Sequence, residues 1–184
     1  PEKKYSKDYQ SGPLSFEYFF DNEKIITNCG FGSGISHKAK ILSKLTSAQS
    51  TLCINDTSVV KFERSKFLIK AFGSSCKESF KISEPKKISD KNEETIKAHH
   101  DAYIDKFGFL HKRELIFDKN RIGFNGQDYI LRKKYEKKIK YSIYFHLRPG
   151  LDAVKTISGD SILIKANKNK SLIFLAKESD LSLE

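Results

Sequence analysis

Short stretches in which hydrophobic and polar residues alternate recur along the chain. In residues 14–20 every second position is apolar, which is the period expected of a β-strand with one buried face. Residues 21–23, Asp-Asn-Glu, suit a turn, and residues 24–27 then return as a second strand. The pattern therefore predicts an antiparallel hairpin near the start of the chain.

Further strand candidates are separated by turn segments rich in Asn, Asp, Gly and Pro. These candidates are residues 50–54, 66–71, 79–83, 94–100, 109–117, 122–125, 142–147, 154–157, 161–165 and 171–176. Residues 38–45 suit a short helix, residues 83–93 suit a long exposed loop, and residues 131–140 form a lysine-rich connection of undefined form. Many short strands without alternating helices predict an all-β protein, an antiparallel sandwich or barrel.

The 184 residues are enough for one domain with a core and few for two. We expect residues 1–11, which are polar, to be a frayed remnant, and residues 12–184 to form the domain. The chain has no Met and begins at Pro1, which we interpret as the sign of a piece of a longer protein. It has no apolar run of about 18 residues, so we expect no membrane span.

The net charge of +11 invites a polyanionic partner, either nucleic acid or an acidic polysaccharide. Only five of the 34 basic residues are arginines, although Arg is the residue that binds phosphate or carboxylate through two parallel hydrogen bonds. Lysines spread over exposed strand faces are therefore an alternative explanation of the charge. Nucleic-acid binding would need Lys or Arg interleaved with aromatic residues on one face, and here the two kinds alternate between faces.

Three cysteines, Cys29, Cys53 and Cys76, are widely spaced and show no Cys-x-x-Cys motif. This spacing argues against a disulfide framework and against a zinc knuckle. We expect small, mostly buried residues, with one bridge from Cys53 to Cys29 or Cys76 as the alternative. A Ser-His-Asp or Cys-His triad has no supporting nucleophile motif in the sequence.

An ordered set of motifs resembles the C-terminal domain of heparinase II/III-like proteins of the alphaproteobacterial type, from about residue 9 to the end. The stretches that carry the resemblance are residues 12–17 (GPLSFE), 25–30 (IITNCG), 46–52 (TSAQSTL), 55–58 (NDTS), 100–103 (HDAY), 108–113 (GFLHKR) and 145–149 (FHLRP). The resemblance implies a multi-stranded antiparallel β-sandwich that follows an N-terminal helical toroid in the full-length chain.

The same resemblance implies a polysaccharide lyase that cleaves acidic, uronate-containing glycans by β-elimination. In that reaction the uronate carboxylate must be neutralised before a base can take the neighbouring C5 proton. The toroid supplies a Tyr and most of the cleft, and a His from the sandwich completes the site. The resemblance favours a periplasmic or secreted location, and the sandwich alone is expected to be inactive.

Three positions depart from the family pattern. Gln10 and Gln49 stand where the family has histidines, and Asn28 stands where many members have Asp. In some members these side chains bind a structural zinc, whereas amides are poor zinc ligands and do not titrate near neutrality. We therefore predict no metal and no cofactor, and a neutral amide cluster that can hydrogen-bond a sugar.

Candidate substrate-binding residues come from the motifs that carry the resemblance. They are Gln10, Asn28, Gln49, His100, Tyr103, His111 and Arg113. His111 and Arg113 share one strand face, so they could grip a carboxylate or form a cross-strand ion pair. His146 is interpreted as a half-buried strand histidine. The prediction is one wall of a lyase cleft, and the alternative is a non-catalytic glycan-binding or structural module that has lost its histidines.

Overall fold

The computed structural model describes residues 5–63, 65–73, 75–134, 138–177 and 179–184. Strands dominate these residues, and every strand pairing is antiparallel. The strands are β1 (Tyr18–Phe20), β2 (Glu23–Thr27), β3 (Leu52–Ile54), β4 (Lys86–Ser89), β5 (Glu93–His100), β6 (Phe109–Asp118), β7 (Asn125–Arg132), β8 (Tyr141–Ile143), β9 (His146–Leu147), β10 (Asp152–Lys155), β11 (Ser161–Lys165) and β12 (Ser171–Leu175). The prediction of an all-β antiparallel fold is confirmed.

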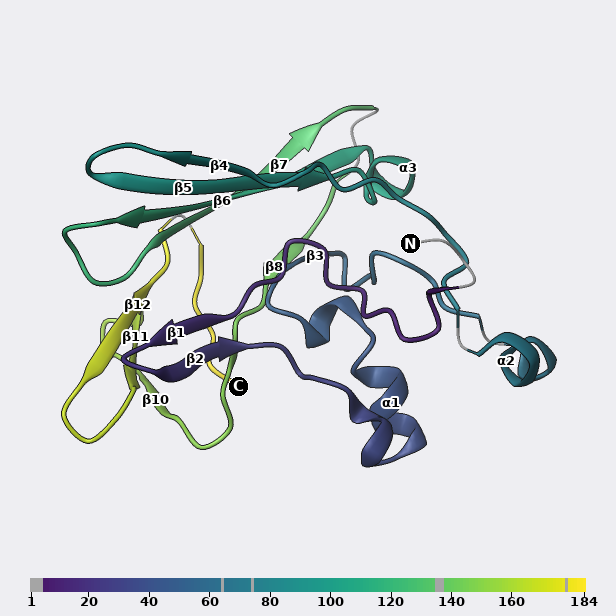
Figure 1. Cartoon of the computed structure of the whole chain (residues 1–184), viewed down its shortest axis with the longest axis horizontal. Coiled ribbons are helices and arrows are strands. Elements are labelled where there is room, and N and C mark those ends of the chain that lie inside the picture. The colour runs from purple at the N-terminus through teal and green to yellow at the C-terminus, as the bar shows by residue number, and fades with distance from the viewer. Residues whose placement is uncertain (1–4, 64, 74, 135–137, 178) are drawn as a thin grey trace.

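The strands form one larger sheet and three smaller ones. The larger sheet has the order β4-β5-β6-β7, and the smaller sheets are β1-β2-β9, β10-β11-β12 and β3-β8. Figure 1 shows the larger sheet as one layer across the top of the molecule, with the smaller sheets below it. The arrangement is the layered packing expected of a sandwich, in which each sheet buries one face.

Two groups of buried apolar residues form the core below the larger sheet. One group joins β3 to the following loop and to Tyr103, and the other joins β2 to β11. Their buried members are Leu52, Ile54, Val59, Val60, Cys76 and Tyr103 in the first, and Ile25, Ile26, Ile162, Ile164 and Ala166 in the second. The period-2 alternation of β11 explains its place in the core, because Ile162 and Ile164 share one face.

The N-terminal hairpin has the predicted position, although β1 is shorter than the alternating pattern of residues 14–20. Asp21 and Asn22 form its loop with φ of 53° and 62°. Two successive residues with positive φ are the geometry of the turn that best fits the twist of a hairpin, and Asp and Asn tolerate it. The hairpin therefore follows from local sequence chemistry.

Three short helices accompany the strands: α1 (His37–Leu42), α2 (Lys66–Phe72) and α3 (Ile104–Phe107). The prediction of a short helix within residues 38–45 is confirmed. The prediction of a strand at residues 66–71 is wrong, because this segment is α2. Gly73 follows α2 with φ of 73°, a positive value that favours glycine, and its N–H donates to the carbonyl of Ile69.

Other segments also differ from expectation. The strands predicted at residues 79–83 and 122–125 are absent, apart from a bridge at Ile82 and the first residue of β7. Residues 83–93 are not only a loop, because β4 lies within them at the edge of the larger sheet. Its exposed lysines fit an edge strand, where charge opposes pairing with other chains. Within residues 5–11, Ser6 and Ser11 are fully buried whereas Tyr5 is 72% exposed, and the Ser6 hydroxyl accepts from the N–H of Cys76. Residues 1–4 and 135–137 lie outside the described residues.

Candidate functional site

The predicted site residues fall into two connected groups. The first is a buried polar chain made of His100, His111, Asp128 and Arg113, which lies on the inner face of the larger sheet. The strand register explains it: His100 pairs with His111 between β5 and β6, and Arg113 pairs with Asp128 between β6 and β7. Because side chains alternate along β6, His111 and Arg113 point the same way.

Hydrogen bonds run in one direction through this buried polar chain. The N–H of Ala102 donates to Nδ1 of His100 (3.3 Å), so Nε2 of His100 carries its proton. That Nε2 lies 3.0 Å from Nδ1 of His111, and Nε2 of His111 lies 2.6 Å from Oδ1 of Asp128. Each imidazole thus donates with Nε2 and accepts with Nδ1, and both are neutral.

Arg113 ends the chain and is the residue that ties it to neighbouring loops. Its Nε and Nη2 donate to the two carboxylate oxygens of Asp128 at 2.8 and 2.9 Å. Its Nη1 donates to the carbonyls of Leu14 (2.9 Å) and Ser50 (2.8 Å). The rings of Phe16 and Phe145 lie 5.4 and 6.0 Å from the guanidinium carbon and shield it from water.

Burial sets the charge states of this chain. His100 and His111 are 0% and 1% exposed. Burial lowers the pKa of His100 to about 3, helped by His111 and Arg113. Burial also lowers the pKa of His111, although Asp128 opposes the shift. Burial alone would raise the pKa of Asp128, but His111 and Arg113 together bring that pKa below its usual value. The arrangement is one buried ion pair with two neutral imidazoles.

Tyr103 belongs to the same interior. It is fully buried, its hydroxyl lies 3.3 Å from the carbonyl of Leu52, and its ring packs against His100 at a centroid distance of 5.6 Å. Burial raises the pKa of this phenol well above its usual range. Four predicted site residues, His100, Tyr103, His111 and Arg113, are therefore buried groups that support the loops around them.

The second group lies on the loops that Arg113 anchors. We call it the amide cluster and define it as Gln10, Asn28 and Gln49. The Gln10 side chain donates to the carbonyl of Gly30, and Oδ1 of Asn28 accepts from the N–H of Ser50 at 2.8 Å. Nε2 of Gln49 donates to the carbonyl of Ser43 at 2.9 Å. Gln10 and Asn28 are half-buried and Gln49 is buried.

Close approach of these loops depends on Gly12. A Cβ added at Gly12 would lie 2.7 Å from Cγ of Gln49, so only glycine fits beside that side chain. The N–H of Gly12 donates to the carbonyl of Gln10. Gly12 therefore lies between the backbone of Gln10 and the side chain of Gln49.

Two residues next to the amide cluster form a contact that the sequence did not reveal. Sγ of Cys29 lies 3.5 Å from Nδ1 of His146, across the pairing of β2 with β9. His146 is half-buried, as predicted, and Cys29 is exposed, which the expectation of buried cysteines missed. Only the register of two strands 117 residues apart brings them together, and no local pattern signals it.

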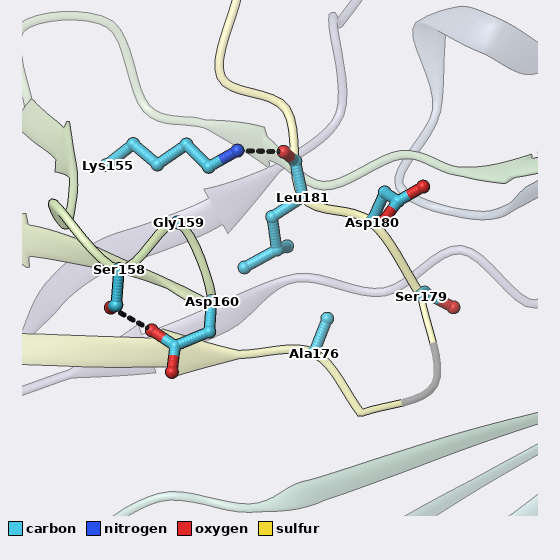
Figure 2. Close-up of a pocket in the computed structure, with 8 residues that line it drawn as sticks. All are labelled: Lys155, Ser158, Gly159, Asp160, Ala176, Ser179, Asp180 and Leu181. Carbon is cyan, nitrogen blue, oxygen red and sulfur yellow. Dashed lines mark hydrogen bonds between the residues drawn. The ribbon is translucent and has the colours of Figure 1, made fainter.

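Two surface hollows in the described part of the chain are lined by residues outside both groups. One of about 370 Å³ is lined by the β10–β11 turn and the C-terminal segment, with Ser158 donating to Asp160 and Lys155 to the carbonyl of Leu181 (Figure 2). Another of about 390 Å³ lies beside Asn55 and Tyr141. Neither is lined by a predicted site residue.

In the described part of the chain, no group of three or more His, Cys, Asp or Glu side chains could hold a metal ion. Also within it, no helix has the length and apolar character needed to cross a membrane. The free thiols of Cys29, Cys53 and Cys76 rule out, in this structure, the alternative of a disulfide.

Comparison with known proteins gives one result. The family model described as heparinase II/III-like, C-terminal, matches residues 1–184, which is the whole chain. No match to the chain was found among curated proteins or among solved structures.

Proposed function

The chain belongs to the heparinase II/III-like C-terminal family, and from that premise we propose that it forms one wall of the substrate cleft of a polysaccharide lyase. The substrate would be an acidic glycan containing uronate, cleaved by β-elimination in the full-length protein. A helical toroid elsewhere in that protein would supply the opposite wall and the remaining catalytic groups.

The observation that carries this proposal is the convergence of three loops. Gln10, Asn28 and Gln49 are distant in sequence, yet they lie on loops joined by direct hydrogen bonds: Gln10 to Gly30, and Asn28 to Ser50. Half-buried amides on adjoining loops suit a surface that binds sugar hydroxyls and carboxylates.

The chemistry of elimination gives these amides a role. An amide N–H that donates to the uronate carboxylate lowers the negative charge that otherwise holds back removal of the C5 proton. Gln10 and Asn28 would act in this way as binding and neutralising groups. His146 adds an imidazole beside them, and an imidazole can transfer a proton, which an amide cannot do.

The buried polar chain would keep the wall rigid. Arg113 holds the carbonyls of Leu14 and Ser50, which flank the amide cluster on two loops. Asp128 binds the guanidinium, His111 donates to Asp128, and His100 donates to His111. A site built on loops needs such support, because small displacements of binding groups reduce transition-state stabilisation steeply.

A direct test incubates the full-length protein with heparan sulfate, alginate and hyaluronan separately. Elimination creates an unsaturated uronate, which is followed by its ultraviolet absorbance. The proposal predicts a steady rise with at least one of these glycans and none with a neutral glucan. Cleavage without unsaturated product would indicate hydrolysis and would contradict the proposal.

A second candidate is a non-catalytic glycan-binding or structural module. It is favoured by the replacement of titratable side chains by amides at Gln10 and Gln49. Binding of this chain to the same three glycans and to single-stranded DNA, over a series of salt concentrations, separates the possibilities. Glycan binding that persists at high salt in a protein without lyase activity supports this candidate. Equal, salt-sensitive binding to DNA would indicate lysine electrostatics alone.

A further inference from the structure

The contact between Cys29 and His146 has the form of a nucleophile with its base. Cys29 follows the end of β2 and its thiol is exposed, and His146 opens β9, where it pairs with Thr27. The distance from Sγ to Nδ1 is 3.5 Å, which is within the range of a hydrogen bond to sulfur.

The imidazole is fixed with the correct nitrogen towards the thiol. Nε2 of His146 lies 2.9 Å from the carbonyl of Ser47, which can only accept, so Nε2 carries the proton and Nδ1 presents its lone pair to Cys29. The ring of Tyr144 stacks on the imidazole at an interplanar angle of 12°. The backbone N–H of His146 donates to the Ser50 hydroxyl, so its main chain is held as well.

The same loop holds Cys29, because its N–H donates to the carbonyl of Ala48 at 3.0 Å. Residues 47–50 therefore bind both members of the pair and set their separation. A third group that orients the base is what distinguishes an activated nucleophile from two side chains in chance contact.

In the resting pair, the surrounding groups favour a protonated Cys29 thiol beside a neutral His146. Tyr144 is the titratable neighbour on the imidazole, and burial raises its pKa. Beyond Thr27 lies Glu17, whose carboxylate binds Lys24 at 2.7 Å. Partial burial raises the pKa of the Cys29 thiol. An unassisted Cys29 would therefore react slowly near neutral pH, and fast reaction would require the imidazole.

We propose that Cys29 and His146 form a thiol–imidazole pair that makes Cys29 a site of thiol–disulfide exchange with small disulfides. His146 Nδ1 takes the S–H proton as Cys29 sulfur attacks one sulfur of the disulfide. The new S–S bond forms, the old S–S bond breaks, and the leaving thiolate takes the proton back from the imidazole. The products are a mixed disulfide at Cys29 and one free small thiol.

The other two cysteines are internal controls. Cys53 and Cys76 are each 2% exposed, and the thiol of Cys53 is directed to the carbonyl of Thr57. Burial raises the pKa of both thiols. In the folded chain they should react only as fast as the fold opens.

The experiment follows reaction of the 184-residue chain with the aromatic disulfide dithiobis(nitrobenzoate), measured by release of its coloured thiol at about pH 6.5. We expect one fast equivalent and two slow ones, and Cys29→Ser should remove the fast phase. His146→Gln should slow that phase about tenfold or more, the range for loss of a general base. His37→Gln is the matched control, because His37 is exposed at the start of α1, and it should leave the rate unchanged.

A second measurement needs no variant. The same chain unfolded in urea exposes all three thiols without a base beside them. The pair predicts that Cys29 in the folded chain reacts faster than the average thiol of the unfolded chain at the same pH. A folded rate below the unfolded rate would overturn the proposal, as would a His146→Gln rate equal to that of the unaltered chain. If the His146→Gln variant unfolds, all three of its thiols will react in the fast phase. The comparison of the folded and urea-unfolded unaltered chain then tests the proposal.

Discussion

At the scale of single residues, the molecule places its most costly charges where each has a defined partner. The guanidinium of Arg113 and the carboxylate of Asp128 are 4% and 7% exposed. Neutral His111 also donates to Asp128, and His100 donates to His111. Among the described residues, no buried side-chain polar atom lacks a hydrogen-bond partner. A buried ion pair adds little stability by itself, but the removal of one member leaves the other charge uncompensated.

Asp128→Asn should therefore destabilise the chain strongly. Arg113 would stay charged inside the protein, and we expect a loss of about 3–5 kcal/mol in the free energy of unfolding. The matched control is Asp105→Asn, because Asp105 is 92% exposed and pairs with Lys134 at the surface. It should change stability by less than about 0.5 kcal/mol. Urea unfolding of the unaltered chain and the two variants measures these free energies. Equal values in all three would contradict the role assigned to the buried polar chain.

Acid should weaken the fold through the buried histidines. The pKa of His100 falls from its ordinary value of 6.5 to about 3 in the folded chain, so below about pH 6.5 the unfolded chain binds a proton that the folded chain does not. The free energy of unfolding therefore has no loss from His100 well above about pH 6.5, and it falls as the pH decreases towards 3.

At about pH 5, His100 alone should cost about 2 kcal/mol relative to pH 7, and His111 adds a loss of the same sign. Urea unfolding at both pH values measures this loss. His37→Gln, which alters an exposed histidine, should keep the full pH dependence. A free energy of unfolding that does not change between the two pH values would refute the assignment of neutral imidazoles.

The sequence revealed these residues unevenly. Alternation placed His111 and Arg113 on one face, and the prediction of a cross-strand ion pair as one of two options is confirmed by Asp128. Asp128 itself was not predicted, because β7 opens with Asn, Gly, Gln and Asp, which are rare in strands. Its role depends on the register with β6, which no local pattern encodes. For the same reason the contact between Cys29 and His146 could not be foreseen.

At the scale of elements, strands with a clear hydrophobic period were predicted almost to their ends, namely β5, β6, β11 and β12. The failures have local causes. The segment that forms α2 is apolar without a period, and its helix-ending Gly73 was overlooked. The strand β4 is exposed along its length, so it buries no face that a pattern could show. Propensity and period therefore predict strands that bury one face better than fully exposed strands and short helices.

Neighbouring residues of β11 offer a test of this alternation. Ile164 is 5% exposed in the core, whereas Leu163 is 44% exposed on the other face. Ile164→Ala should cost about 2–4 kcal/mol in the free energy of unfolding, and Leu163→Ala less than about 1 kcal/mol. Thermal and urea unfolding of the pair measure the difference. A larger loss from Leu163→Ala would mean that its face is covered in solution.

At the scale of the whole molecule, the larger sheet lies above the smaller sheets (Figure 1). Arg113 of the larger sheet binds the loops that carry the amide cluster. The boundary of the domain at residue 12 stays a prediction, although residues 5–11 pack against the loops near Cys76 and Lys44. The charge of +11 belongs to this scale as well. In the proposed function it would attract an acidic glycan over distances of about a Debye length, without specifying the glycan.

The central claim, that the amide cluster faces the glycan during elimination, is tested most directly by single substitutions in the full-length protein. Gln10→Ala and Asn28→Ala should each lower kcat/KM for release of unsaturated uronate about tenfold or more, since each removes a carboxylate-neutralising group. Asn125→Ala, at the exposed start of β7, removes an amide that is not part of the amide cluster and should leave kcat/KM unchanged. Equal values of kcat/KM in all four proteins would contradict the account.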